Sequence, residues 1–308
     1  MELEANAQSS YSSTSIEGNP LPLTDVKKIL RTKPQQIRNT EREVVNYNEA
    51  LLKLKKLLSF QKFELNSKVI LSIHQQVTRG LLPKFHSGHF RKEPVFVNDP
   101  RKRMTIYWPP DHQDVPKLMK ELVQFVSENK GHLDPIILSG IFHKQFVIIH
   151  PFIDGNGRTV RLATKSILAD LGIDTFHLFS FENYYNRNVT AYFRNVGVQG
   201  NYYDIQPKIT FTDWLEYFAI GILDELLRVR KILEKTRFSE KPSDRISQEQ
   251  QQILDFIQRT GYIQDKDYAK LTTRAKATRS LDFRKLVEHG VIERQGRGPA
   301  TYYILKKS

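Results

Sequence analysis

One twelve-residue segment, HPFIDGNGRTVR at residues 150–161, constrains the fold of this chain more than any other feature. Pro151 disfavours helical dihedral angles at the residue before it, so the apolar helix predicted over LDPIILSGIFHKQFVII ends at His150. Gly155 and Gly157 permit a tight turn, and a second helix over TVRLATKSILADLG follows at once. The segment therefore predicts two helices joined by a short loop, with an imidazole at the end of the first helix.

The loop and the start of the second helix form a predicted anion site. A glycine turn that leads into a helix directs unpaired N–H groups and the helix dipole toward a ligand. Arg158 and Arg161 project from neighbouring helix positions, and each guanidinium can bind phosphate oxygens through two N–H groups. Asp154 is the only carboxylate in the loop, and beside phosphates it is a candidate Mg²⁺ ligand. His150 is the candidate general base.

Each of these features has an ordinary explanation when it is taken alone. A histidine before proline is usually structural, a GNG turn is often only a turn, and arginines at a helix start are usually surface charge. Their combination within one short segment favours a nucleotide site. A zinc site from His143 and His150 is a weaker alternative, because a third ligand of the usual kind is missing nearby. The Walker A pattern GxxxxGK[ST] is absent.

Most of the chain has apolar residues at helical spacing, and its 308 residues leave room for about two domains. Short β-rich runs between about 88 and 110 predict a hairpin on a helical protein. A polar stretch near 236–250 predicts a linker, followed by three helices and two short strands. The clearest helical stripes are Val44, Tyr47, Leu51, Leu54 and Leu58; Val115, Leu118, Leu122 and Phe125; and Phe218, Ile222, Leu226, Val229 and Leu233.

Composition narrows the class of protein. The formal charge of +13 favours a polyanionic partner without choosing among nucleic acid, nucleotide and acidic protein. Cysteine is absent, which excludes disulfides, cysteine nucleophiles and thiolate metal sites. The sequence has neither a leader pattern at its start nor an apolar run of the roughly 20 residues that span a bilayer. We therefore expect a cytoplasmic protein without a membrane partner.

The segment HPFIDGNGRTVR matches the Fic motif HxFx(D/E)GNGRxxR at every defined position, and the region from about 10 to 235 resembles the whole Fic domain, a mainly α fold with a small β-hairpin flap. Proteins of this family typically transfer AMP from ATP to a hydroxyl side chain of a target protein. The resemblance implies that His150 deprotonates a target Ser, Thr or Tyr, which attacks the α-phosphate and expels pyrophosphate. It also implies a nucleotide site, with Mg²⁺ on Asp154, made of Asp154, Gly155, Asn156, Gly157, Arg158, Arg161 and Asn201. The flap that clamps the target corresponds to Val95, Phe96, Val97 and Asn98.

A second pattern of the same family lies near the start of the chain. Ser13, Glu17 and Gly18 fit the inhibitory motif [S/T]xxxE[G/N]. A carboxylate on a helix docked near the loop would pair with Arg161 and leave the α-phosphate of ATP turned away from in-line attack. The alternative is an ordinary helix end at which Gly18 stops a short helix.

The end of the chain resembles a winged helix-turn-helix. We expect Leu281, Leu286 and Val287 to supply its core, and the sequence leaves open whether it binds DNA or protein. The candidate DNA contacts lie early in the recognition helix and on the wing, and they are Arg274, Lys276, Thr278, Arg279 and Arg297.

Together these observations predict a mainly α protein with an inhibitory helix segment at 1–20, a Fic domain at 21–236, a linker at 237–248 and a winged helix at 249–308. The predicted function is autoinhibited AMP transfer from ATP, with Mg²⁺, to a target protein. One alternative is AMP removal, or use of another nucleotide donor, on the same fold. The other is a nucleotide-sensing DNA-binding regulator. A homodimer is left open.

Overall fold

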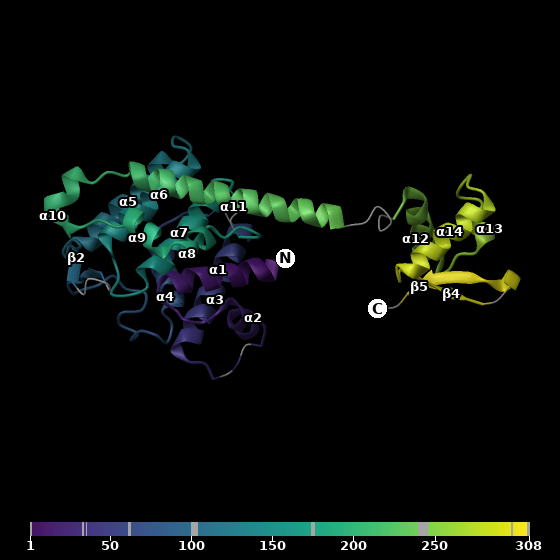
Figure 1. Cartoon of the computed structure of the whole chain (residues 1–308), viewed down its shortest axis with the longest axis horizontal. Helices are drawn as coiled ribbons and strands as arrows, with labels where there is room; N and C mark the ends of the chain where they lie inside the picture. Colours follow the sequence, from purple (N-terminus) through teal and green to yellow (C-terminus); the bar gives the residue numbers. More distant parts are fainter. Residues whose placement is uncertain are drawn as a thin grey trace. The chain divides into compact units, whose positions relative to one another are not determined.

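The computed structural model describes residues 2–32, 34, 36–60, 63–99, 104–173, 176–239, 246–296 and 298–306. Its contacts divide the chain into two compact units, Met1–Arg230 and Lys231–Ser308, which are described separately (Figure 1). The division falls inside one long helix, so the domain limits expected at 236 and 248 stay predictions. Residues 240–245 of the expected linker lie outside the described residues.

The first unit is mainly helical and carries a small three-stranded sheet. Its helices are α1 (Glu2–Ile16), α2 (Leu23–Thr32), α3 (Asn39–Phe60), α4 (Ser67–Val77), α5 (Val115–Asn129), α6 (Pro135–Ile149), α7 (Asn156–Asp170), α8 (Phe181–Arg187), α9 (Val189–Val196), α10 (Tyr202–Ile205) and the first part of α11 (Thr212–Ser239). Its strands are β1 (Val97–Asp99), β2 (Met104–Trp108) and β3 (Gly200–Asn201), and a 3-10 helix spans Gln206–Lys208.

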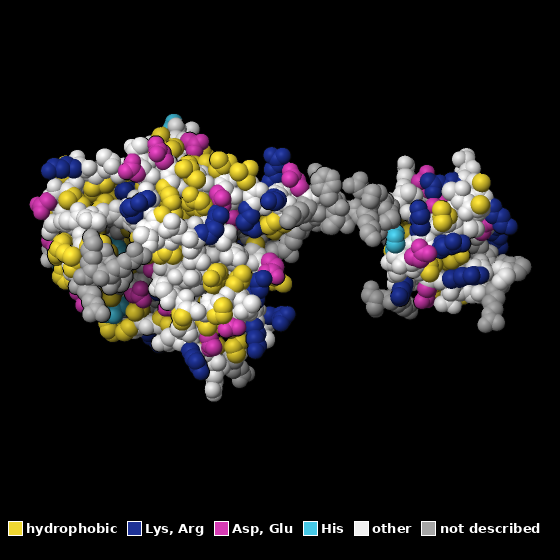
Figure 2. All heavy atoms as spheres, viewed as in Figure 1, with side chains coloured by type: hydrophobic (Ala, Val, Ile, Leu, Met, Phe, Trp, Pro, Cys, Tyr) yellow, Lys and Arg dark blue, Asp and Glu magenta, His cyan; other side chains and the backbone are white. Residues whose placement is uncertain are grey.

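Helix α7 lies at the centre of this unit, and its residues from Arg158 to Leu168 are all buried. Helices α1, α3, α4 and α6 pack against it, and in α3 the apolar stripe with Val44, Tyr47 and Leu51 is buried. The stripe predicted in α11 is wrong beyond Ile222, since Leu226 and Leu233 are 44% and 45% exposed. The helix continues past the core against which its first turns pack, and hydrophobic side chains gather over it on the face in Figure 2.

The small sheet lies beside the C-terminal end of α6. β1 pairs antiparallel with β2, with Val97 opposite Tyr107 and Asn98 opposite Thr105. β2 pairs in parallel with β3, so Trp108 lies opposite Asn201. The buried Tyr107 hydroxyl donates to the Ile148 carbonyl over 2.8 Å, which ties β2 to the end of α6. Residues 100–103 between the two strands lie outside the described residues.

The second unit contains α12 (Gln248–Thr260), α13 (Asp265–Tyr268), α14 (Lys276–Glu288), β4 (Ile292–Gln295), a 3-10 helix (Gly298–Ala300) and β5 (Tyr302–Leu305). β4 and β5 pair antiparallel, and the unit has its own apolar core. Two expected core residues are exposed, Leu281 by 44% and Val287 by 38%, whereas Leu286 is buried as expected. Phe283 is buried in their place, so the inward face of α14 runs through Phe283 and Leu286. The winged-helix assignment stays a prediction.

Within the described parts of the chain, the helices are all too short or too polar to cross a lipid bilayer.

Candidate functional site

His150 ends α6 in an unusual backbone conformation. It is the C-cap of that helix and adopts the left-handed region, with φ 49° and ψ 61°. Among the described residues it is the only non-glycine residue with positive φ. An L-residue in this region is strained by about 1–2 kcal/mol. The helix therefore ends where Pro151 predicts, and the surrounding structure holds the histidine in a costly geometry.

The imidazole of His150 is neutral at pH 7. Burial lowers its pKa from 6.5 to about 4, although the Val147 carbonyl, Glu17 and Asp154 act in the opposite direction. Its Nδ1 lies 3.3 Å from the Val147 carbonyl oxygen. Because a carbonyl only accepts, Nδ1 carries the proton and Nε2 keeps a free lone pair. The ring can therefore accept a proton at Nε2.

The loop after His150 is built by its own polar groups. The Asn156 side chain accepts from the Phe152 N–H at 3.0 Å and donates to the Phe152 carbonyl at 2.8 Å. Gly155 has φ 77° and is the N-cap of α7, which begins at Asn156, three residues earlier than expected. Asn156 thus holds the turn with its side chain, and the free N–H groups of the first turn of α7 point toward the loop side.

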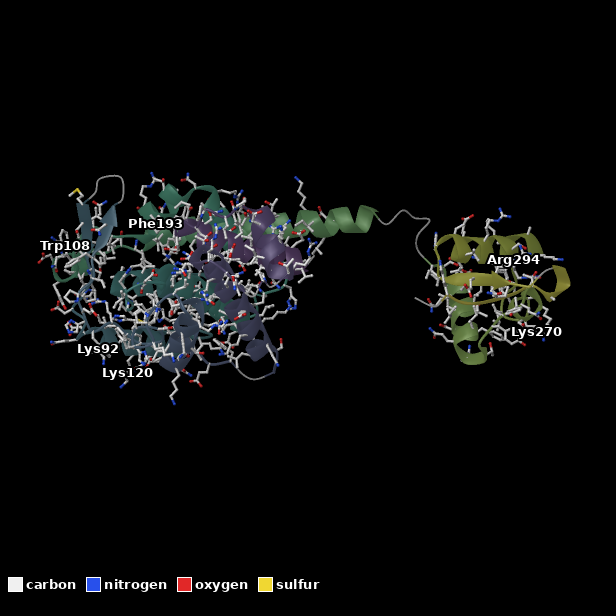
Figure 3. All side chains as sticks on the ribbon, turned by 90° about the horizontal axis from the view of Figure 1, so that it is seen from below. Lys92, Trp108, Lys120, Phe193, Lys270 and Arg294 are labelled. Atoms are coloured by element: carbon white, nitrogen blue, oxygen red, sulfur yellow. The ribbon has the colours of Figure 1, made fainter. Side chains whose placement is uncertain are left out.

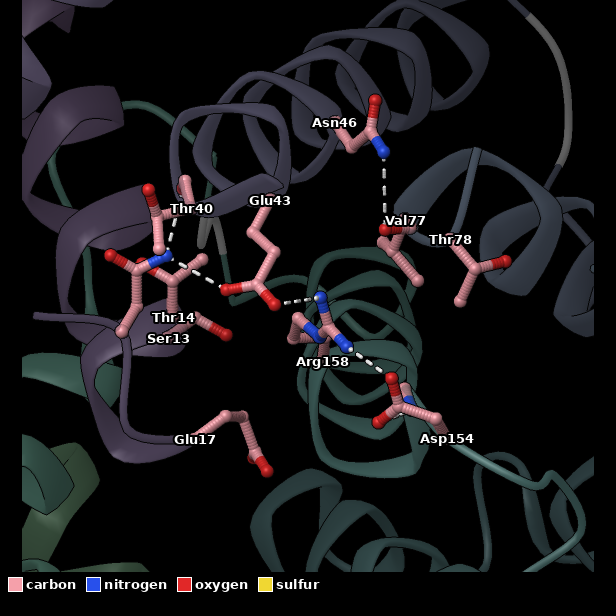
Figure 4. A network of polar contacts seen from close by, with 12 residues as sticks. Ser13, Thr14, Glu17, Thr40, Glu43, Asn46, Val77, Thr78, Asp154 and Arg158 are labelled. Carbon is pink, nitrogen blue, oxygen red and sulfur yellow. Dashed lines mark hydrogen bonds and ion pairs between the residues drawn. The ribbon is translucent and has the colours of Figure 1, made fainter. Parts of the chain in front are cut away.

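Arg158 is buried and bridges two carboxylates (Figure 4). Its Nη2 donates to Asp154 Oδ2 at 3.2 Å, and its Nη1 lies 3.5 Å from Glu43 Oε1. Asn19, just after α1, donates to Glu43 Oε2 at 2.7 Å. Sequence reasoning missed Glu43 and Asn19, which occupy positions with no distinguishing pattern.

Arg161 is fully buried and is held by the end of α1. Its Nε donates to Ser13 Oγ and its Nη2 to the Ser13 carbonyl, both at 2.8 Å. The same Nη2 donates to Glu17 Oε1 at 2.7 Å. Burial lowers the pKa of the guanidinium, but Glu17, Tyr192 and Tyr47 together outweigh it and the net pKa is raised.

The carboxylate of Glu17 covers the first turn of α7. A Cβ atom added to Gly157 would lie 2.0 Å from Glu17 Oε1 and 2.9 Å from Arg161 Nη1. Gly18 has φ 90° and follows the end of α1 at Ile16, so the ordinary helix stop and the Glu17 contact are both present. An acidic group of the protein itself therefore occupies the predicted anion site.

The residues fit a Mg²⁺ site better than a zinc site. The Asp154 side chain is 59% exposed, and a single carboxylate suits an ion that takes its other ligands from phosphate and water. Within the described residues, no group of three His, Cys, Asp or Glu side chains could hold a metal. The alternative of a zinc site that includes His143 is wrong, because both ring nitrogens of this buried side chain have protein partners. Nδ1 lies 3.0 Å from Thr164 Oγ1, and Nε2 lies 3.1 Å from the Tyr192 hydroxyl.

His74 also supports the loop and was missed from the sequence. The Gly88 N–H donates to its Nδ1 at 2.9 Å, so Nε2 carries the proton that it donates to the Asp154 carbonyl at 3.0 Å. The ring stacks on Phe152 at a centroid distance of 3.7 Å. Burial lowers its pKa to about 4, so the ring is neutral at pH 7. The position of His74 within the apolar stripe of α4 is the sequence signal that could have identified it as a buried residue.

The expected flap residues lie on and before β1. Phe96 is 55% exposed and Val95 is half-buried, while the Asn98 side chain accepts from Thr105 Oγ1 at 2.8 Å. Figure 3 shows Trp108 of the neighbouring strand, which is 40% exposed. Asn201 lies beside that strand, where its side chain accepts from the Tyr203 N–H at 3.0 Å and caps α10. Nucleotide contact by Asn201 stays a prediction.

Two of the expected DNA contacts are bound inside the second unit. Arg274 donates to both oxygens of Asp282, at 2.8 and 3.0 Å, and Arg279 donates to both oxygens of Asp265, at 2.9 and 3.0 Å. Lys276 and Thr278 are exposed, and Arg297 lies outside the described residues. Figure 3 labels Lys270 and Arg294, which are further exposed cations of this unit.

Comparison with known proteins identifies the family that this site resembles. Residues 64–168 match the Fic/DOC family. A protein adenylyltransferase Fic of Nematostella vectensis is 31% identical over 212 residues, which cover 68% of this chain and 46% of that protein. The chain thus spans less than half the length of this relative. A Fic family protein from Desulfovibrio desulfuricans superposes with a TM-score of 0.65 at 21% identity, covering 99% of this chain and 87% of that one. A Fic domain containing signaling protein from Bacteroides thetaiotaomicron gives a TM-score of 0.60 at 20% identity, over 72% and 84%.

Proposed function

Because this chain carries a Fic domain, we propose that it transfers AMP from ATP to a hydroxyl side chain of a target protein and that its own first helix restrains the reaction. The observation that carries the proposal is the Glu17 carboxylate on Arg161, at the start of α7. A buried arginine beside a helix N-terminus that binds an internal carboxylate is equally suited to a phosphate. The curated relative's name, protein adenylyltransferase, indicates the nucleotide.

The chemistry assigned to His150 follows from its proton state. Nε2 takes the proton of the target hydroxyl, and the oxygen attacks the α-phosphorus of ATP. The bond between the α-phosphorus and the bridging oxygen breaks, and pyrophosphate leaves with the electron pair. Burial lowers the His150 pKa in the free protein, and we expect the negative charge of bound phosphates to raise it and make the ring a stronger base.

The remaining site residues hold the nucleotide. Asp154 would ligate Mg²⁺, which neutralises phosphate charge when bound. Arg158 and Arg161 bind the phosphates, and Gly157 leaves room for them because a side chain there would enter the space above α7. In the structure Glu17 occupies this space, so the terminal phosphate must displace it or bind elsewhere. Target residues pair with the strand edge near Val97.

Labelled ATP tests the proposal directly. Wild-type protein, Glu17→Gly and His150→Ala are incubated with Mg²⁺, a cell extract and ATP labelled at either the α- or the γ-phosphate. We expect α-label on protein with Glu17→Gly, much less with wild type and none with His150→Ala. Transfer of γ-label, or equal α-label with all three proteins, would overturn the proposal.

AMP removal is the second candidate for the same site. Glu17 is 31% exposed beside the anion site, so its carboxylate can also reach a water molecule. Glu17→Gly separates the two activities, because it relieves the restraint on transfer and removes the group that would orient the water. A slower loss of AMP from a modified target in this variant would favour removal.

The order of elements in the second unit supports a winged helix. The internal ion pairs of Arg274 and Arg279 leave Lys276 and Thr278 as the exposed contacts of α14 for a nucleic acid. A cytoplasmic location and a homodimer stay predictions of the sequence.

A further inference from the structure

The C-terminal end of α6 is held by side chains from outside the helix. The last carbonyls of a helix have no partners within it. Here the Ile148 carbonyl accepts from the Tyr107 hydroxyl at 2.8 Å, and the Ile149 and His150 carbonyls accept from Arg91 Nη2 and Nε at 3.4 and 2.9 Å. The Arg91 N–H also donates to the Pro151 carbonyl, at 3.0 Å. Arg91 thus contacts the backbone before, at and after the catalytic histidine.

The same guanidinium contacts the chain where it enters β1 and where it leaves β2, at the open end of this antiparallel pair. Nη1 donates to the carbonyl of Glu93, four residues before β1, at 3.2 Å, and Nη2 donates to the carbonyl of Pro110, two residues after β2, at 2.5 Å. Arg91 is only 3% exposed, and within the described parts of the chain it forms no ion pair. Burial lowers the pKa of this guanidinium. A buried charge bound only to carbonyls is costly, so a role beyond stability would account for its position here.

The backbone of His150 supplies that explanation. A strained left-handed residue persists only where its surroundings hold it. The bond from Arg91 Nε to the His150 carbonyl fixes the peptide plane that follows the Cα of His150, and the Arg91 backbone N–H holds the next carbonyl, that of Pro151. The first of these planes sets ψ of the histidine, and with it the direction in which the imidazole leaves the end of α6.

We propose that Arg91 is a positioning residue that aims the His150 imidazole and couples it to the β1–β2 pair. A target chain docked on β1 then meets a base whose direction is set by the same side chain that anchors the open end of the strand pair. This inference rests on the proposed AMP transfer. It assigns to Arg91 no contact with ATP and no part in proton transfer.

The test uses the full chain with Glu17→Gly, which relieves the restraint, as the parent. Arg91→Ala is added to it, and the matched control is Arg79→Ala, which removes an exposed arginine paired with Glu49. We expect Arg91→Ala to lower kcat about 100-fold, as for a base displaced by about 1 Å, with KM and Kd for ATP changed less than about twofold. Guanidinium ion at millimolar concentration restores kcat, and sodium at equal ionic strength does not. Arg79→Ala leaves kcat unchanged.

Two results for Arg91→Ala would overturn the inference. One is an unchanged kcat. The other is a parallel loss of kcat, of ATP binding and of the thermal unfolding transition, with no recovery of any of them when guanidinium ion is added. Failure of the proposed function is recognised separately, because the parent itself then transfers no AMP. Hydrogen exchange of the amides at residues 146–150 decides the positioning role in that case. Faster exchange there in Arg91→Ala, slowed by guanidinium, supports it, and exchange equal to the parent contradicts it.

Discussion

Replacement of Glu17 by glycine separates the restraint on the site from its stability. Glu17 contributes one charged hydrogen bond of 2.7 Å to an arginine that is fully buried. Such a bond contributes about 2 kcal/mol, which corresponds to roughly a 30-fold change in the equilibrium between the anion site covered by Glu17 and the open site. We expect the variant to transfer AMP about 10 to 100 times faster than wild type, measured with α-labelled ATP under initial-rate conditions.

The same change leaves a buried guanidinium short of its anion. We therefore expect the free variant to lose about 2 kcal/mol of unfolding free energy, and to regain more stability than wild type when ATP is added, because phosphate then replaces the carboxylate. Glu17→Gln keeps the size of the side chain and should lie between the two. Glu4→Gln is the matched control, since it removes an exposed ion pair between Glu4 of α1 and Lys27 of α2. Equal transfer rates and equal stabilisation by ATP in wild type and Glu17→Gly would refute the reasoning.

Three further results are expected. Gly157→Ala should abolish transfer even when Glu17 is glycine, because its Cβ enters the space above α7 that the phosphates need; full activity of the double variant in the labelled-ATP assay would contradict this. The pKa of His74 is about 4 in the folded protein and about 6.5 in the unfolded chain, so the unfolded chain binds more protons between these pH values. Up to roughly 3 kcal/mol of unfolding free energy is therefore lost as the pH falls from 6.5 to 4. His74→Gln should flatten this pH dependence in urea unfolding at about pH 7 and 5, and an unchanged dependence would count against the reasoning. Any DNA binding by the second unit should weaken with Lys276→Ala and with added salt, as measured by fluorescence anisotropy. Arg279→Ala should chiefly lower the unfolding temperature of the unit, because Arg279 is paired with Asp265. The reverse pattern would place the DNA contact on Arg279.

Local signals in the sequence predicted the parts of the fold and site that depend on neighbouring residues. Pro151 identified the end of α6, and Gly18 the end of α1. The spacing of Arg158 and Arg161 placed both on the first turns of α7. Such features depend on backbone preferences and helical periodicity, which act over a few residues.

The residues that support the site escaped prediction because their partners are distant in the chain. Glu43 meets Arg158 from α3, and His74 holds the Asp154 carbonyl from α4. Arg91 lies in a basic stretch in which it looks like a surface residue, and only its burial distinguishes it. In the second unit, Leu281 was expected inside and Phe283 is buried in its place, since a shift of two residues turns a helix face by more than half a turn.

The composition of α1 bears on how the restraint can be released. Most of its buried residues carry hydroxyl groups: Ser9, Ser10, Ser12, Ser13 and Thr14. Its contacts to the rest of the unit are accordingly polar, as in the hydrogen bond from Ser9 Oγ to the buried Glu182 at 3.0 Å. Water can satisfy such groups at modest free-energy cost, whereas an apolar helix would expose surface that drives association with other chains. On the proposed restraint, we expect a helix with this face to detach from the unit and dock again without making the open protein prone to aggregate.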